Sequence, residues 1–205
     1  ILAGIPNSES RIAELRVDYI TETIAPEDEL VSTLLYAQST LPFRTILQTV
    51  RALPLETKQE IVDSIQNKRT SHDWPSREFE VGQGMIFDTL FDYGAFRDLQ
   101  RHRLTTQINQ EITTVNGYEI PRDLEDAGLL PTYQKIMESN KSRVAELSQK
   151  LGSATSQYLI ALGWKKRTLF KMNLREFYHL VELRTRAGGH FSYRDLCYDM
   201  YEQVK

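Results

Sequence analysis

The sequence lacks several features that mark common classes of protein. It has a single cysteine, Cys197, which excludes an internal disulfide and a metal site made only of cysteines. No apolar run approaches the ~18 residues of a membrane-spanning helix, and no signal peptide is visible. The formal net charge of −3 gives no basic excess of the kind that binds nucleic acid. We therefore expect no membrane partner, no nucleic-acid partner, no metal and a cytoplasmic location.

The composition is that of a globular domain. Of 205 residues, 40% are hydrophobic and 26% are charged, so the chain can bury a sizeable core. The length corresponds to one domain, with room for a small appendage. The chain starts at Ile1 without a methionine, which suggests a piece of a longer protein.

The N-terminal third is predicted to consist of short helices separated by prolines. Residues 9–21 have a mainly helical pattern, and helices are expected after Pro26 and after Pro42. A capping box at Thr57 predicts the start of a further helix. The helical pattern of the sequence ends at Thr70. We therefore divide the chain into a helical part, 1–69, and a second part, 70–205, within one compact unit.

The second part mixes extended and helical patterns. Residues 71–76 are typical of a loop, and residues 79–87 alternate in polarity as a strand does. A helix is expected from about Asp92. A long helix is predicted from Pro131 to the glycine at 152, and a shorter apolar one at 158–164. Ser192 resembles the N-cap of a last helix.

A basic triplet, Arg101-His102-Arg103, follows the helix that starts near Asp92. If that helix continues, Arg103 lies on its apolar side with Phe96 and Leu99, while Arg101 and His102 point elsewhere. Two interpretations remain open. The triplet is either a solvated helix C-terminus, favoured by the helix dipole, or a site for an anion that relieves the repulsion between the cations.

A second polar segment spans residues 173–186. Asn173 is a predicted N-cap with Glu176 three positions later. Arg175, His179, Glu182 and Arg186 recur at helical spacing and share one face. That face is either simply solvated or part of a binding site.

Arg184 is harder to explain as a surface residue, because its spacing from Phe177 and Leu180 places it on the side expected to be buried. An unpaired buried guanidinium is costly, so it needs an anion. Glu80, Asp88, Asp195 or a phosphorylated ligand are the candidates, and structural pairing and ligand binding both remain open.

Together the two segments resemble the signature of the flavin-dependent thymidylate synthases (ThyX). The triplet matches the family's Arg-His-Arg, and Asn173-x-Arg175-x-x-x-His179-x-x-x-Leu183-Arg184 matches its second block. Residues 118–121 are similar to an extended piece of the family that ends in proline. His72 with the Phe-Glu pair at 79–80 is similar to its His-Glu-x-Pro-Phe-Glu. The resemblance covers about 70–200.

The resemblance implies an α+β fold with an antiparallel sheet, long helices and a helical N-terminal part. It implies a homo-oligomer, either a tetramer or a dimer of tandem domains, with FAD as cofactor and NADPH as reductant. The family methylates dUMP with methylene-tetrahydrofolate. It places Arg184 at the substrate and leaves the catalytic residue unassigned. The cofactor-binding positions that it implies are Arg101, His102, Arg103, Asn173, Arg175 and His179.

Positions that contact the nucleotide in the family are not kept. The serine and arginine that follow its triplet correspond to Glu111 and Thr113, and an arginine of a later segment corresponds to Gln157. Asn109 and Asp98 replace an acidic residue and a glutamine. The resemblance thus predicts a ThyX-like protein with a degenerate site for the dUMP phosphate. The alternative is an inactive or repurposed domain that binds flavin or supports oligomerisation, and a helical interaction module ranks last.

Overall fold

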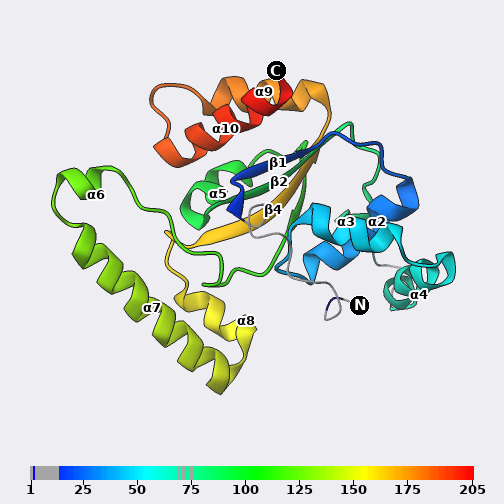
Figure 1. The fold of residues 1–205 in the computed structure, drawn as a ribbon, viewed down its shortest axis with the longest axis horizontal. Coiled ribbons are helices and arrows are strands. Elements are labelled where there is room, and N and C mark those ends of the chain that lie inside the picture. The colour runs from blue at the N-terminus through cyan, green and yellow to red at the C-terminus, as the bar shows by residue number, and fades with distance from the viewer. Residues whose placement is uncertain (1, 3–13, 69, 71–72, 74–75) are drawn as a thin grey trace.

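The computed structural model describes residue 2 and residues 14–68, 70, 73 and 76–205. Within these residues, a four-stranded antiparallel sheet with the order β1-β2-β4-β3 forms the centre, and helices lie on both sides of it (Figure 1). The predicted α+β class with an antiparallel sheet is confirmed. The strands are β1 (Val17–Ile20), β2 (Met85–Asp92), β3 (Thr106–Asn109) and β4 (Lys165–Met172). The described helices are α2 (Pro26–Ala37), α3 (Phe43–Arg51), α4 (Leu55–Gln66), η2 (Arg77–Phe79), α5 (Tyr93–Leu99), α6 (Asp123–Asp126), α7 (Leu130–Leu151), α8 (Ser153–Ser156), η3 (Gln157–Leu159), α9 (Leu174–Arg184) and α10 (Phe191–Val204).

Each face of the sheet has its own apolar core, because side chains alternate across a strand. On one face, Phe87 and Phe170 pack against apolar residues of α5, α9 and α10. On the other, Ile86 and Leu169 pack against α2 and α3. Residues on both sides of position 69 contribute to these cores. The division of the chain there stays a prediction about domain organisation.

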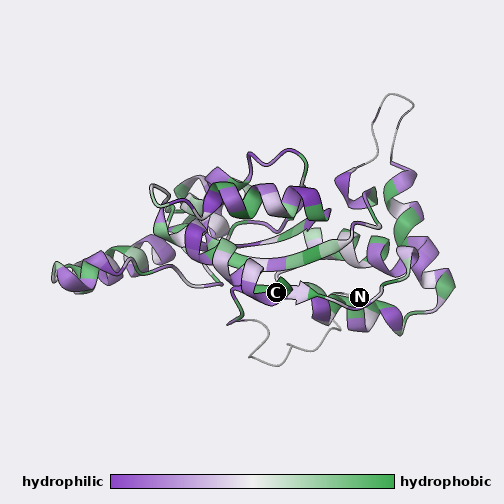
Figure 2. Ribbon diagram, turned by 90° about the horizontal axis from the view of Figure 1, so that it is seen from above, coloured by the Kyte–Doolittle hydropathy of each residue, from purple (hydrophilic) through white to green (hydrophobic). Residues whose placement is uncertain are grey.

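Helix α7 extends away from the sheet as an arm (Figures 1 and 2). As predicted, proline stands in its first turn and Gly152 follows its end, with a φ of 85°. Its inner side packs on Trp164, whose indole Nε1 donates to Asn140 at 2.7 Å. Its outer side leaves Ile136 exposed. None of the described helices, α7 included, is long and apolar enough to cross a membrane.

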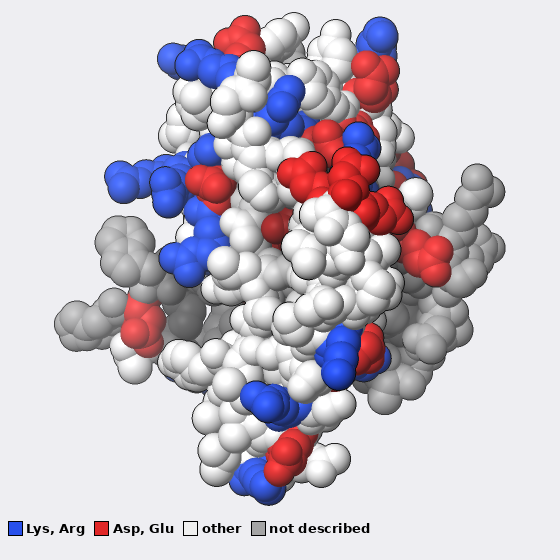
Figure 3. All heavy atoms as spheres, turned by 90° about the vertical axis from the view of Figure 1, so that its left-hand side faces the viewer, with Lys and Arg blue, Asp and Glu red and all other residues white. Residues whose placement is uncertain are grey.

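Acidic side chains gather on the side of the molecule from which the arm projects (Figure 3). The short helix α6, which precedes α7, lies on this side and is acidic along most of its length. The acidic residues of its first turn are Asp123, Glu125 and Asp126.

The inner strand β4 has no counterpart in the sequence prediction, because three lysines and an arginine interrupt its apolar pattern. Two of these cations are fully buried and paired. Lys171 Nζ lies 2.8 Å from Glu29 Oε1 of α2, and Arg167 Nη1 lies 3.1 Å from Asp88 Oδ2 of β2. Such pairs offset the cost of burying charge. The partners are distant in sequence, so local patterning does not reveal the strand.

Several predicted boundaries are wrong. Residues 17–20 form a strand and not the end of a helix, while residues 9–13 and His72 lie outside the described residues. The strand predicted at 79–87 begins at Met85, after the 3-10 helix η2. Residues 158–164 contain only the end of η3 and then a loop, in which Ile160 and Trp164 pack against α7 while Tyr158 is exposed.

Two predicted helix caps are also wrong. Helix α4 starts after Pro54, upstream of the capping box at Thr57. The N-cap of α10 is His190, whose Nδ1 accepts from the Ser192 amide at 3.3 Å. The Ser192 hydroxyl instead donates to Asp92, which ties the start of α10 to the start of α5. A tertiary contact therefore outweighs the local capping signal.

Candidate functional site

The two polar segments identified in the sequence meet at one cavity. Helix α5 is capped by Asp92, which accepts from the Ala95 amide at 2.8 Å, and α9 by Asn173, which accepts from the Glu176 amide at 3.0 Å. Both helices pack on the same face of the sheet, so the turn after α5 lies against α9. A cavity of about 270 Å³ lies between the two segments. It is lined by Arg101, His102, Arg103, Leu104, Glu176, His179, Leu183 and Arg184.

His102 is the buried member of the triplet, with 5% of its surface exposed. Its Nδ1 lies 2.9 Å from Glu176 Oε1, and Arg184 Nε donates to its Nε2 at 3.0 Å. Because a guanidinium only donates, Nε2 must be the acceptor and Nδ1 carries the proton. Burial lowers the pKa of His102, and the Arg184 guanidinium lowers it further, against the Glu176 hydrogen bond that raises it. The ring is therefore held neutral in one tautomer.

The prediction that Arg103 lies on an apolar helix face is wrong. Helix α5 ends at Leu99, and the triplet occupies the turn that follows. In that turn His102 points inward, while Arg101 and Arg103 are exposed. The continued helix expected from the sequence would have reversed these positions.

Arg184 is partly buried, as predicted, with 15% of its side chain exposed, but its partners differ from those expected. Its Nη2 donates to the Asp98 carbonyl oxygen at 2.6 Å, and its Nη1 lies 3.8 Å from the Asp98 carboxylate. Its guanidinium also lies over the Tyr193 ring, 5.5 Å from the centroid. The donors of Arg184 are thus engaged by Asp98 and His102, while Asp88 pairs with Arg167.

The remaining predicted cofactor residues are exposed, but only Arg101, Arg103 and His179 line the cavity, whereas Asn173 and Arg175 are not among its lining residues. Arg101, Arg103, Arg175 and His179 are all exposed, and Arg101 approaches the Asp98 carboxylate only to 3.9 Å. Within the described part of the chain, Arg103 and Arg175 have neither an ion pair nor a hydrogen bond. These free guanidiniums are suited to an anionic group, since arginine binds phosphate oxygens with two parallel donors.

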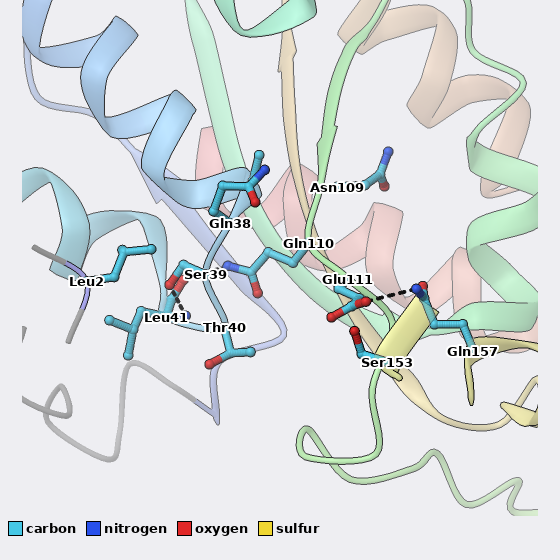
Figure 4. A pocket seen from close by; sticks show the side chains of 11 residues that line it. Leu2, Gln38, Ser39, Thr40, Leu41, Asn109, Gln110, Glu111, Ser153 and Gln157 are labelled. Carbon is cyan, nitrogen blue, oxygen red and sulfur yellow. Dashed lines mark hydrogen bonds between the residues drawn. The ribbon is translucent and has the colours of Figure 1, made fainter. Parts of the chain in front are cut away.

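A second, larger cavity of about 940 Å³ lies on the other side of the molecule's centre, between the C-terminal end of α2, the end of β3 and α8 (Figure 4). At one side of it, the Gln157 amide Nε2 donates to Glu111 Oε1 at 2.9 Å (Figure 4). Both are among the positions at which the sequence departs from the ThyX pattern. The structure places them in direct contact, although they are 46 residues apart.

Sequence reasoning missed two residues of the first site. Glu176 was expected only as a capping residue, yet its carboxylate holds His102, which lies 74 positions away. Asp98 was expected only as a departure from the ThyX pattern, yet it binds Arg184 through its backbone. No spacing rule connects residues this far apart, and a backbone carbonyl carries no signal in the sequence. Only the acidic side chain of Glu176, without an obvious local partner, could have suggested a distant contact.

Residues 35–205 match the model of a family described as thymidylate synthase complementing protein. This chain belongs to that family. The match starts within α2, so membership reaches further toward the N-terminus than the motifs in 70–200 suggest. The ThyX resemblance inferred from the two polar segments is thereby confirmed.

Its curated relatives are longer proteins. A UPF0159 protein of Chlamydia muridarum (strain MoPn / Nigg) is 32% identical over 177 residues, which cover 86% of this chain and 33% of that protein. A UPF0159 protein of Chlamydia pneumoniae is 29% identical, over 83% of this chain and 32% of that protein. The UPF0159 protein Ta1429 of Thermoplasma acidophilum is 26% identical, over 78% and 32%. The chain thus spans about a third of the length of these family members.

A solved structure shares the fold. The UMP/dUMP methylase PolB from Streptomyces cacaoi, bound with 5-Br dUMP, superposes with a TM-score of 0.54 at 11% identity. The superposition covers 92% of this chain and 89% of that chain. At this level of identity the likeness establishes the family fold alone.

Proposed function

We propose that this protein is a ThyX-like domain that binds FAD at the cavity between α5 and α9. The observation that supports the proposal is the convergence of the two segments there, with the unpaired guanidinium of Arg103 among the lining residues. His102 and Arg184 hold the two segments together, while Arg103 and Arg175 are free to bind the cofactor pyrophosphate and the exposed Arg101 can leave its long contact of 3.9 Å with Asp98 to join them.

The chemistry of these residues fits part of FAD. A pyrophosphate needs fixed, always-charged donors, and Arg101 and Arg103 provide them. The cavity of about 270 Å³ is smaller than the ~300–1,000 Å³ that encloses a drug-sized ligand, so the remaining part of FAD extends beyond it. A second copy or a tandem domain completes the site, in line with the homo-oligomer that family membership suggests. When bound, the flavin supplies hydride-transfer chemistry, with NADPH as the reductant.

A second candidate function is a flavin-binding or oligomerisation module without thymidylate synthase activity. The contact between Glu111 and Gln157 favours it. A carboxylate at this position repels a phosphate, and Gln157 offers no positive charge to compensate. Under this alternative the family substrates dUMP and methylene-tetrahydrofolate are not turned over.

The first experiment is a titration of the purified protein with FAD, followed by flavin absorbance and fluorescence. A hydrogen bond from a charged donor contributes about 1.5–3 kcal/mol, so Arg101→Ala and Arg103→Ala should each weaken FAD binding about tenfold or more. Arg97→Ala is the matched control, because Arg97 is exposed on α5 and does not line the cavity. If FAD does not bind, or if all three variants bind it equally, the proposal is wrong.

A second experiment separates the two candidates. Tritium release from 5-tritiated dUMP, with NADPH and methylene-tetrahydrofolate present, measures the family reaction. Release by protein that contains FAD supports the enzyme. FAD binding without release supports the module.

A further inference from the structure

The turn that carries the triplet is tied to strand β3 by the side chain of Gln107. The Gln107 Nε2 lies 3.4 Å from the carbonyl oxygen of Leu99, at the end of α5, and 3.2 Å from that of His102. It also donates to Thr105 Oγ1 at 2.8 Å. Gln107 stands opposite Phe170 of β4, so its side chain lies on the face of the sheet that carries α5 and α9. The turn is thereby anchored to the sheet.

Thr105 holds the same turn from within it. Its side chain is 0% exposed, and its hydroxyl donates to the His102 carbonyl oxygen at 2.7 Å while accepting from Gln107. The Thr105 carbonyl oxygen accepts in turn from Arg77 Nη2 of η2 at 3.0 Å. Carbonyl groups at a helix end have no partner within the helix, and these side chains supply donors beside that end.

These contacts act on the backbone of the triplet and not on its ligand. Glu176 and Arg184 of α9 hold the ring of His102, whereas Gln107 and Thr105 hold its carbonyl oxygen. Neither Gln107 nor Thr105 lines the cavity between α5 and α9, and neither carries a charge. Any effect of these two residues on an anion bound there must therefore pass through the conformation of the turn.

We propose that Gln107 and Thr105 are positioning residues, which hold the turn in the conformation that buries the His102 ring and presents Arg101 and Arg103 to a ligand. That the ligand is FAD rests on the proposed function. The fixing of His102 rests on the contacts alone.

The test compares variants that remove a hydrogen bond with variants that keep it. Thr105→Val keeps the shape of the side chain but loses the hydroxyl, whereas Thr105→Ser keeps the hydroxyl but loses a methyl group. Gln107→Met removes the amide donors. Gln100→Met makes the same change at an exposed residue of the turn, whose side chain makes no hydrogen bond in the described part of the chain. Urea denaturation verifies that each variant is folded.

The first readout is the affinity for FAD. Thr105→Val and Gln107→Met should each weaken FAD binding about three- to tenfold, which is the effect of losing one neutral hydrogen bond. Thr105→Ser and Gln100→Met should bind FAD as tightly as the unmodified protein does.

The second readout needs no flavin. Burial lowers the pKa of His102, so a loosened turn that exposes the ring should raise this pKa toward its ordinary value. Nitrogen chemical shifts of the ring, measured at successive pH values, should show the rise in Thr105→Val and Gln107→Met but not in Thr105→Ser or Gln100→Met.

Equal losses in Thr105→Ser and Thr105→Val would assign the effect to packing and overturn the inference. Unchanged FAD affinity and an unchanged pKa of His102 in Thr105→Val and Gln107→Met would also overturn it. If Gln107→Met does not fold, the two Thr105 variants decide. If the unmodified protein binds no FAD, the proposed function fails, and the pKa of His102 alone then decides this inference, since a rise in the two variants supports it and no rise refutes it.

Discussion

Replacement of Arg184 by methionine tests whether this arginine is a structural tie between α5 and α9. Its guanidinium donates to the Asp98 carbonyl oxygen at 2.6 Å and to His102 Nε2 at 3.0 Å, and it lies over the Tyr193 ring. A hydrogen bond from a charged donor contributes about 1.5–3 kcal/mol, and a cation–π contact about 0.5–1 kcal/mol where it is exposed. Since Arg184 is only partly buried, we expect a loss of about 2–4 kcal/mol in the free energy of unfolding.

The assay is urea denaturation followed by circular dichroism. With a slope of about 2 kcal/mol/M, the midpoint of Arg184→Met should fall by roughly 1–2 M. Arg186→Met is the matched control, because Arg186 is exposed just beyond the end of α9 and should change stability by less than about 0.5 kcal/mol. A midpoint for Arg184→Met equal to that of the control would refute the reasoning.

A second readout follows the imidazole itself. The Arg184 guanidinium is one of the groups that lower the pKa of His102, so its removal should raise that pKa. Nitrogen chemical shifts of the ring should report this rise as protonation of Nε2, while the Glu176 carboxylate keeps the proton on Nδ1. A purely steric role for Arg184 would move neither quantity.

Two further predictions concern titratable groups. Burial holds the pKa of His102 below its ordinary value of about 6.5, so below that pH the unfolded chain binds a proton that the folded protein does not. The stabilisation due to His102 should be complete above about pH 6.5 and should decline as the pH falls toward the pKa of His102 in the folded protein. Denaturation at successive pH values should therefore show a shrinking difference in stability between the unmodified protein and His102→Gln. A difference that does not depend on pH would contradict this. Burial raises the pKa of the Cys197 thiol to about 12. At neutral pH a thiol reagent should therefore react with the protein unfolded in urea but only slowly with the native state. Rapid reaction with the native state would show that Cys197 is not buried.

Local interactions explain what the sequence predicts correctly. The start of α2 at Pro26, the start of α5 after Asp92, the cap of α9 at Asn173 and the end of α7 at Gly152 all depend on residues within one helical turn. The family signature is likewise local, since each of its two blocks lies within one short segment. These features fixed the class of fold and the family before any contact was known.

The tertiary structure decided which of the signature residues are available to a ligand. His102 and Arg184, the positions that the signature alone assigns to cofactor and substrate, bind each other together with Glu176 and Asp98, while Arg103 is exposed. The charged strand β4 and the contact between Glu111 and Gln157 likewise depend on distant partners. A charge whose partner lies 46 to 142 positions away has no periodicity to reveal it, because only the packed sheet and helices bring the two groups within hydrogen-bonding distance.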